Sequence, residues 1–141
     1  MSWRIGYGDV SNFSIRTNGD QVGNALQIWY TADTNAYVRY FFDTNQLRLY
    51  RMTNGMTTAS LLVENLTNAS GDGMTFRAQD YLGSSVSCAS IDVTNANYKS
   101  TILTTLEFCQ YQYPLTKVGP KYYYNYYRIR FRTASHNCSF P

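Results

Sequence analysis

Short runs in which apolar and polar side chains alternate constrain the fold of this chain more than any other feature of its sequence. The clearest are Ala25–Thr31, Ala36–Phe42 and Leu47–Met52. Successive side chains of a β-strand point to opposite faces, so a period of two residues predicts strands with one face in a core. The turns between these runs are short and polar, and the Asn-Gly pair in Thr53–Gly55 strongly favours a tight turn. We therefore expect three antiparallel strands in a meander.

The rest of the chain extends this pattern. Ala59–Leu66 fits either a short helix or a buried strand, because its leucines satisfy both periodicities. Further strands are expected at Met74–Asp80, from Ile91, at Thr101–Tyr113 and at Tyr122–Thr133. The sequence thus predicts a mainly β fold, an antiparallel meander sheet with long, turn-rich loops and at most one short helix.

The length of 141 residues suffices for one domain with a hydrophobic core. Residues 1–23 are rich in turn signals, and we expect a loop or short strands that lead into a single β head domain at residues 24–141. The sequence contains no run of about 18 apolar residues, the length that a membrane-spanning helix needs.

The segment Lys121–Arg132 combines aromatic and basic residues, as nucleic-acid-binding strips do. In a strand, however, its side chains separate into two sets, Arg128, Arg130 and Arg132 against Tyr127, Ile129 and Phe131. A protein that binds single-stranded nucleic acid needs aromatic and basic groups on one exposed face, so that bases stack on the rings while the basic groups neutralise phosphates. The alternation instead predicts a half-buried strand with an apolar inner face, and the net charge of +3 does not by itself indicate nucleic acid. We expect no nucleic-acid binding.

Residues that carry chemistry are few. The single histidine, His136, lies near the chain end, and the two glutamates are Glu64 and Glu107. The three cysteines show no C-x-x-C spacing, and no Gly-rich phosphate loop follows a strand. We expect no enzyme activity, no cofactor and no metal, although calcium at Ser70–Gly73 is left open.

Several segments resemble the globular head of type IV pilin-like proteins, that is, minor pilins and type II secretion pseudopilins. They are "YVRYFFDTNQLRLYR", "LLVENLTNASGDGMTFR", "LEFCQYQYPLTKVG" and "YYNYYRIRFRTASHN", which together span roughly residues 24–137. Family members begin with a Phe-Thr-Leu-Ile-Glu-like processing site and a long apolar helix, and neither occurs in this sequence.

The resemblance implies a non-catalytic structural subunit of a type IV pilus or type II secretion pseudopilus in the bacterial cell envelope. Its partners would be other subunits of the filament, and it would meet the membrane only through the missing N-terminal helix. Some relatives have a disulfide that fixes the C-terminal region. Here Cys138 would pair with Cys109 or with Cys88, and the pair Cys109–Cys138 is the one we expect.

Exposed aromatic residues are the candidate contact sites. The run Tyr122, Tyr123 and Tyr124 and the side chain of Trp29 are expected to form interfaces. The same residues, together with Trp3, also suit an alternative function, since aromatic rings stack on sugars. The alternative is a carbohydrate-binding or adhesin-like β-sandwich module. A small enzyme that uses His136 is the third possibility.

Overall fold

The computed structural model describes residues 2–68, 75–88, 100–111, 117–118, 121–122 and 124–134, and the side chains at 3–68, 75–88, 100–108 and 127–134. The described residues form strands and turns, with no α-helix among them. In chain order the strands are β1 (Ser2–Gly8), β2 (Phe13–Ser14), β3 (Val22–Gly23), β4 (Ala25–Trp29), β5 (Tyr37–Asp43), β6 (Arg48–Thr53), β7 (Ser60–Val63), β8 (Phe76–Asp80), β9 (Ser100–Tyr111), β10 (Lys117–Val118), β11 (Lys121–Tyr122) and β12 (Tyr124–Ala134).

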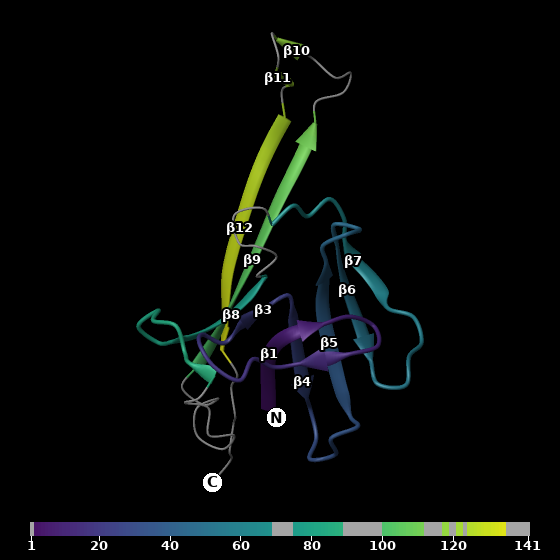
Figure 1. Cartoon of the computed structure of the whole chain (residues 1–141), viewed down its shortest axis with the longest axis vertical. Helices are drawn as coiled ribbons and strands as arrows, with labels where there is room; N and C mark the ends of the chain where they lie inside the picture. Colours follow the sequence, from purple (N-terminus) through teal and green to yellow (C-terminus); the bar gives the residue numbers. More distant parts are fainter. Residues whose placement is uncertain are drawn as a thin grey trace.

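Two antiparallel sheets make up the body of the protein (Figure 1). One sheet has six strands in the order β2-β1-β4-β5-β6-β7, and the other has four in the order β12-β9-β8-β3. Strands β10 and β11 form a separate two-stranded ribbon between β9 and β12. The chain is therefore mainly β, as its alternation predicts.

The hydrophobic core lies between the two sheets. The six-stranded sheet contributes Trp3, Ile5, Leu26, Phe42 and Leu49, and the facing side chains are Phe76, Ala78 and Ile102, with Leu66 beside them. All of these side chains are buried, and Ile5, Ala78 and Leu66 are completely so. Burial of a large aliphatic or aromatic side chain contributes roughly 1.5–3 kcal/mol, so this layer is the main source of stability.

The predicted meander is confirmed. Strands β4, β5 and β6 pair in sequence, and β7 continues the sheet, so Ala59–Leu66 contains a strand and not a helix. This strand is not buried, because β7 is the edge of its sheet and Leu61 and Leu62 are exposed. The strand expected from Ile91 falls on residues 91–99, which lie outside the described part of the chain. The next described strand, β9, begins at Ser100.

The first 23 residues do more than lead into the head. They form β1, β2 and β3, and β1 is a seven-residue strand between β2 and β4. Trp3 and Ile5 belong to the same core cluster as Leu26 and Phe76. Of the two alternatives, a loop or short strands, the structure has strands; the turn signals concealed only the length of β1, because its two glycines favour turns.

Gly6 and Gly23 allow β1 to lie close to both β2 and β3. A Cβ atom added at Gly23 would lie 1.8 Å from the carbonyl oxygen of Gly6, and one added at Gly6 would lie 2.1 Å from that of Ser14. Both neighbours are backbone atoms, so neither can move aside without distorting a strand. Position 23 must therefore lack a side chain where β3 passes β1, and position 6 must lack one where β1 lies beside β2.

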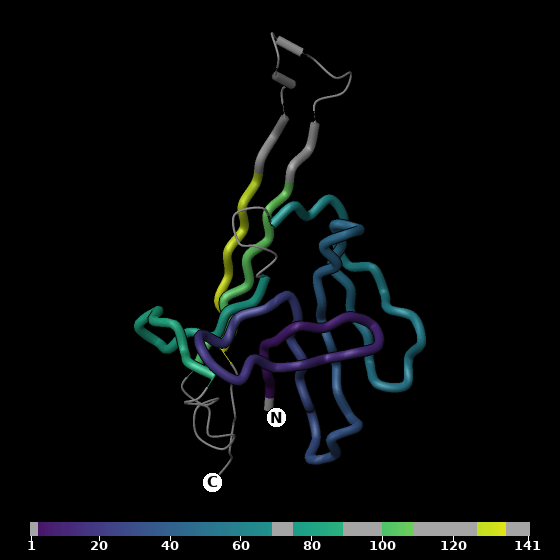
Figure 2. Tube along the Cα trace, in the orientation of Figure 1, coloured from purple at the N-terminus to yellow at the C-terminus, as the bar shows by residue number. Residues whose placement is uncertain are grey.

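Asn24 fixes this passage between the two sheets. Its Nδ2 donates hydrogen bonds to the carbonyl oxygens of Gly8 and Phe42, both at 2.9 Å, and its Oδ1 accepts one from the Gly8 backbone at 3.0 Å. The Phe42 backbone nitrogen also donates to the Asn24 carbonyl oxygen at 2.8 Å. One side chain thus ties β1 and β5 to the corner, as Figure 2 lets the reader follow along the trace.

The outer face of the six-stranded sheet carries a second, smaller cluster around Arg39. This arginine is 5% exposed, and its Nε donates to Gln27 Oε1 at 2.8 Å while its Nη1 donates to the Asp9 carbonyl oxygen at 2.8 Å. The guanidinium also lies over the rings of Phe13 and Tyr37. Hydrogen bonds and ring contacts compensate the desolvation of the charge and attach the β1–β2 turn to the sheet.

The Gly6–Gly23 approach makes a specific stability prediction. Gly23→Ala should lower the free energy of unfolding by about 3 kcal/mol or more, because the new methyl group overlaps backbone atoms. Urea denaturation monitored by tryptophan fluorescence measures the loss. Gly55→Ala is the control: its φ is +78° and nothing lies within 4 Å of the added Cβ, so strain alone should cost about 1 kcal/mol. Equal losses in the two variants would contradict the close approach.

Candidate functional site

Strand β12 is the least enclosed long element of the described structure. It pairs antiparallel with β9 over its whole length, from Tyr124 opposite Tyr111 to Ala134 opposite Thr101. The sheet ends at β12, and the β9–β12 hairpin extends beyond the other strands of both sheets (Figure 1). A strand in this position offers a surface to another molecule.

The apolar residues of β12 form a half-exposed row. The exposed fractions are 54% for Tyr127, 50% for Ile129 and 46% for Phe131. Ile129 lies opposite Leu106 and Tyr127 opposite Phe108, two residues that pack against the core. The row therefore points to the core side of the sheet, as the alternation predicts. The predicted burial of Ile129 and Phe131 is wrong, because the strand lies at the sheet edge, beyond the cover of the facing sheet.

The arginines of β12 point to the other face. Arg128 lies opposite Glu107, and its Nε is 3.5 Å from Glu107 Oε1. The Glu107 side chain is only 2% exposed, and its backbone nitrogen donates to Asn68 Oδ1 at 2.9 Å. The other glutamate, Glu64, is exposed and lies 3.7 Å from Arg48 of β6. Each glutamate thus pairs with its own arginine, on a different sheet, and the two do not act as one carboxylate pair.

The predicted interface aromatics are only partly described. Trp29 in β4 is half-buried, packs edge-to-face against Phe13 with ring centroids 6.4 Å apart, and donates from Nε1 to the Thr34 carbonyl oxygen at 3.1 Å. Tyr122 lies in β11 and Tyr124 in β12, but their side chains, and all of Tyr123, lie outside the described part. Trp3 is 2% exposed, so the expectation that it presents a ring to a sugar is wrong.

The cysteines are also only partly described. Cys88 is a free thiol whose Sγ donates to the Asp20 carbonyl oxygen at 3.5 Å. Burial raises the pKa of this thiol above its ordinary value, while Arg16 and Arg4 act in the opposite direction. The backbone of Cys109 lies in β9 opposite Tyr126, whereas Cys138 lies outside the described residues. The Cys109–Cys138 disulfide stays a prediction, and so does the role of His136.

Metal ligands and membrane-spanning segments can be assessed only where the structure is described. In those ranges no three histidine, cysteine, aspartate or glutamate side chains gather as a metal site would need. None of the described elements is a helix long and apolar enough to cross a membrane. The loop at Ser70–Gly73, for which calcium was left open, falls outside them.

Comparisons with known proteins add no relative: no protein-family model, no curated protein and no solved structure matches this chain. The fold therefore defines its class, a mainly β protein of two packed antiparallel sheets. Its strongest candidate for function is the β12 row, because that row is an apolar surface that the fold leaves open.

The exposure of the row predicts a small effect of truncation. Phe131→Ala should lower the free energy of unfolding by about 1 kcal/mol, because about half of the ring is already in water. Phe42→Ala, in the core at 1% exposure, should cost about 3–5 kcal/mol. Urea denaturation of the two variants makes the comparison. A loss at Phe131 as large as that at Phe42 would show that the row is buried.

The environment of Cys88 predicts slow alkylation. Because burial raises its pKa, less thiolate is present at neutral pH than in the unfolded chain, and thiolate is the reacting form. Iodoacetamide labelling, followed at the Cys88 peptide by mass spectrometry, should reach half its maximal rate at a higher pH in the folded protein than in urea. A lower midpoint in the folded protein would contradict the assigned cause.

Proposed function

We propose that this chain is a non-catalytic structural subunit of a filament, the head of a type IV minor pilin or a type II secretion pseudopilin. The observation that carries the proposal is a pair of open apolar edges on different sheets. One is the β12 row of Tyr127, Ile129 and Phe131, and the other is β7 with Leu61 and Leu62, which are 43% and 47% exposed.

The two edges lie on opposite sides of the molecule in Figure 1. Strand β12 ends the four-stranded sheet, and β7 ends the six-stranded sheet. Edge strands present free backbone hydrogen-bonding groups, so exposed edges with apolar side chains favour pairing with another chain. Two different edges in contact give a heterologous interface, and such an interface builds an open filament when its rotation does not close a ring.

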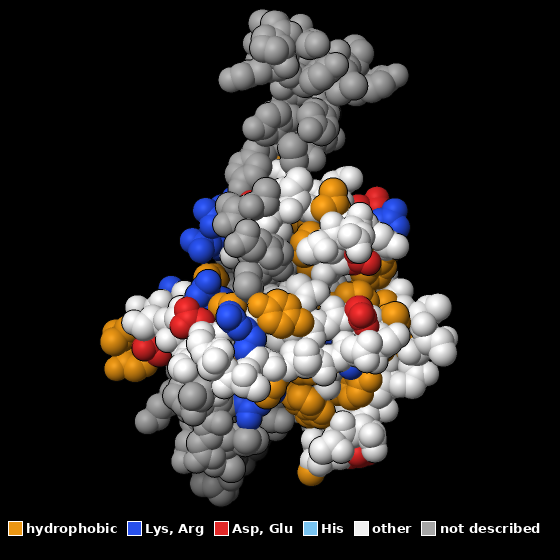
Figure 3. All heavy atoms as spheres, viewed as in Figure 1, with side chains coloured by type: hydrophobic (Ala, Val, Ile, Leu, Met, Phe, Trp, Pro, Cys, Tyr) orange, Lys and Arg blue, Asp and Glu red, His pale blue; other side chains and the backbone are white. Residues whose placement is uncertain are grey.

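Charge favours the same pairing of edges. Basic side chains gather along the β12 side of the molecule in Figure 3. In the sequence of β12, Arg128, Arg130 and Arg132 alternate with the residues of the apolar row. Glu64 follows β7 directly and forms only an exposed pair with Arg48. Exposed pairs contribute little, so Glu64 is available to an arginine of a neighbouring subunit. We therefore assign the β7 edge of the next copy as the occupant of the β12 row.

A simpler explanation of the β12 arginines is that they protect this edge strand from pairing with other chains. Charged side chains along an edge strand prevent uncontrolled pairing between sheets. This explanation covers Arg130 and Arg132, but it leaves an apolar row exposed on the opposite face of the same strand. Aromatic residues and arginine are both enriched in protein interfaces, which accounts for the two sets together.

The alternative of a carbohydrate-binding module gains no specific support from the described side chains. Trp3 is buried, and the Trp29 ring packs on Phe13. The sandwich of two sheets is compatible with such a module, but fold alone does not define function. A glycan array tests this alternative directly.

The proposal predicts where neighbouring subunits touch. In the bacterium that encodes the chain, the double variant Ile129→Cys, Leu62→Cys should give a ladder of multimers after treatment with a short bismaleimide. Each single variant should give no ladder beyond that of the native thiols, because a heterologous contact needs both edges. Filaments sheared from the cell surface should contain the chain.

Substitution of the row provides the matched control. Ile129→Asp should lower incorporation into sheared filaments about tenfold or more, since a charge is placed in an apolar contact. Tyr81→Asp changes a side chain that is 77% exposed in the turn after β8 and should leave incorporation unchanged. Absence of the chain from surface filaments, or a normal yield with Ile129→Asp, would overturn the proposal.

A further inference from the structure

A small cavity opens beside β1, apart from both edges considered above. Its volume is about 100 Å³, and none of its lining residues belongs to β7 or β12. The lining residues come from β1, from the segment between β2 and β3, and from the turn region after β8; they are Arg4, Ile5, Ile15, Arg16, Gln21 and Cys88. Two cations, one amide and one thiol thus share a cavity with two apolar side chains.

The two arginines bring positive charge to this cavity, and no ion pair within the described part of the chain compensates it. The ion pairs of the described residues join Arg48 to Glu64, Arg77 to Asp20 and Arg128 to Glu107, so they leave out Arg4 and Arg16. Arg4 is half-buried, and this burial lowers its pKa. Two guanidinium groups lining one small cavity repel each other, and an anion between them removes that cost.

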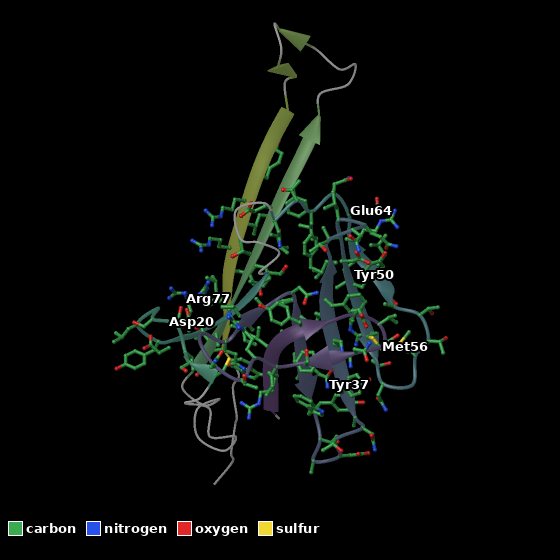
Figure 4. All side chains as sticks on the ribbon, viewed as in Figure 1. Asp20, Tyr37, Tyr50, Met56, Glu64 and Arg77 are labelled. Atoms are coloured by element: carbon green, nitrogen blue, oxygen red, sulfur yellow. The ribbon has the colours of Figure 1, made fainter. Side chains whose placement is uncertain are left out.

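The carboxylate of Asp20, a negative charge that acts on the Cys88 thiol, forms its ion pair with Arg77 and with neither arginine of the cavity. Its Oδ2 lies 3.2 Å from Arg77 Nη1, and Figure 4 shows the two labelled side chains next to each other. The Cys88 thiol contributes no negative charge, because it donates its hydrogen to the Asp20 carbonyl oxygen and its raised pKa keeps it neutral.

Gln21 gives an independent sign of a missing ligand. Its side chain is 2% exposed, and Oε1 is buried without a hydrogen-bond partner among the described residues. The backbone of Gln21 is held in place by Val86 and Ala78, which accept from and donate to it at 2.8 and 2.9 Å. Gln21 lines the cavity, and a buried amide oxygen without a partner costs free energy that a bound group can offset once the side chain turns toward it. Rotation of the amide exchanges Oε1 for the Nε2 donor, so Gln21 suits either an O–H or an O⁻ group.

We propose that this cavity binds the oxyanion group of a small ligand, a carboxylate or a phosphate. Arg4 and Arg16 donate charge-assisted hydrogen bonds to its oxygens, and the Gln21 amide completes the polar contacts. Ile5, which is fully buried, and Ile15, which is 51% exposed, form an apolar floor and rim against the rest of the ligand. The cavity volume limits the buried part to a single oxyanion group and the few atoms attached to it.

Isothermal titration of the full chain with inorganic phosphate and with acetate tests the proposal. Saturable binding in the millimolar range or tighter is expected for one or both anions, and the anion that binds identifies the ligand class. Chloride at equal ionic strength is the reference. No saturable binding of either anion beyond that of chloride would overturn the proposal.

Two variants locate the binding. Arg16→Gln should raise the dissociation constant for the anion about tenfold or more, because it removes a charged hydrogen-bond donor. Ile15→Glu adds a carboxylate at an exposed rim position, so it should abolish anion binding without a loss of folding. Arg51→Gln removes an arginine of β6 and should change nothing. Equal weakening by Arg51→Gln and Arg16→Gln would show nonspecific charge effects and overturn the proposal.

Protection of Cys88 gives a second readout. Saturating anion should slow iodoacetamide labelling of the Cys88 peptide at constant pH and ionic strength, because the ligand fills the cavity that the thiol lines. Unchanged labelling under conditions where titration shows binding would place the anion elsewhere. The labelling experiment does not depend on filament assembly. Anion binding in the cavity and the proposed filament function can therefore be contradicted independently of each other.

Discussion

The contact between the backbones of Gly6 and Gly23 is the constraint on which the remaining structure depends. Here β1 of one sheet meets β3 of the other, and no side chain separates them. Asn24 follows at once and bonds the Gly8 and Phe42 backbones, so the chain changes sheets within one residue. Because this corner is tight, Trp3 and Ile5 enter the core beside residues from both sheets. A looser crossing would separate the sheets and open the core.

The same construction that closes the core leaves the sheet edges open. Among the described strands neither sheet closes on itself, so the four-stranded sheet ends at β12 and the six-stranded sheet at β7. Apolar side chains at both ends remain about half in water. A folded body with two dissimilar apolar edges is suited to head-to-tail contact with copies of itself, and this is the physical basis of the proposed filament role. The cavity beside β1 adds a chemically different site, defined by charge.

The sequence predicts the central strands of the larger sheet, but it does not predict the cavity beside β1. The meander at β4, β5 and β6 follows from alternation and turn residues alone, since both are local properties. The length of β1 was hidden because Gly6, which locally signals a turn, lies against Gly23, and Gly23 is distant in the sequence. The cavity was hidden for the same reason: Arg4, Arg16 and Cys88 are brought together by tertiary packing, and no spacing between them signals it.

The amino-acid order by itself determined which face of each strand a side chain occupies. On β12 it separated the arginines from Tyr127, Ile129 and Phe131, and the pairing with β9 agrees with that separation. Only the tertiary structure decided which of these faces is covered. The odd or even position of a residue along a strand assigns its side chain to one side of the sheet. Burial of that side chain requires, in addition, a second layer over that side. The facing sheet covers Phe76 and Ile102 but leaves Ile129 half in water, and no local pattern records where that cover ends.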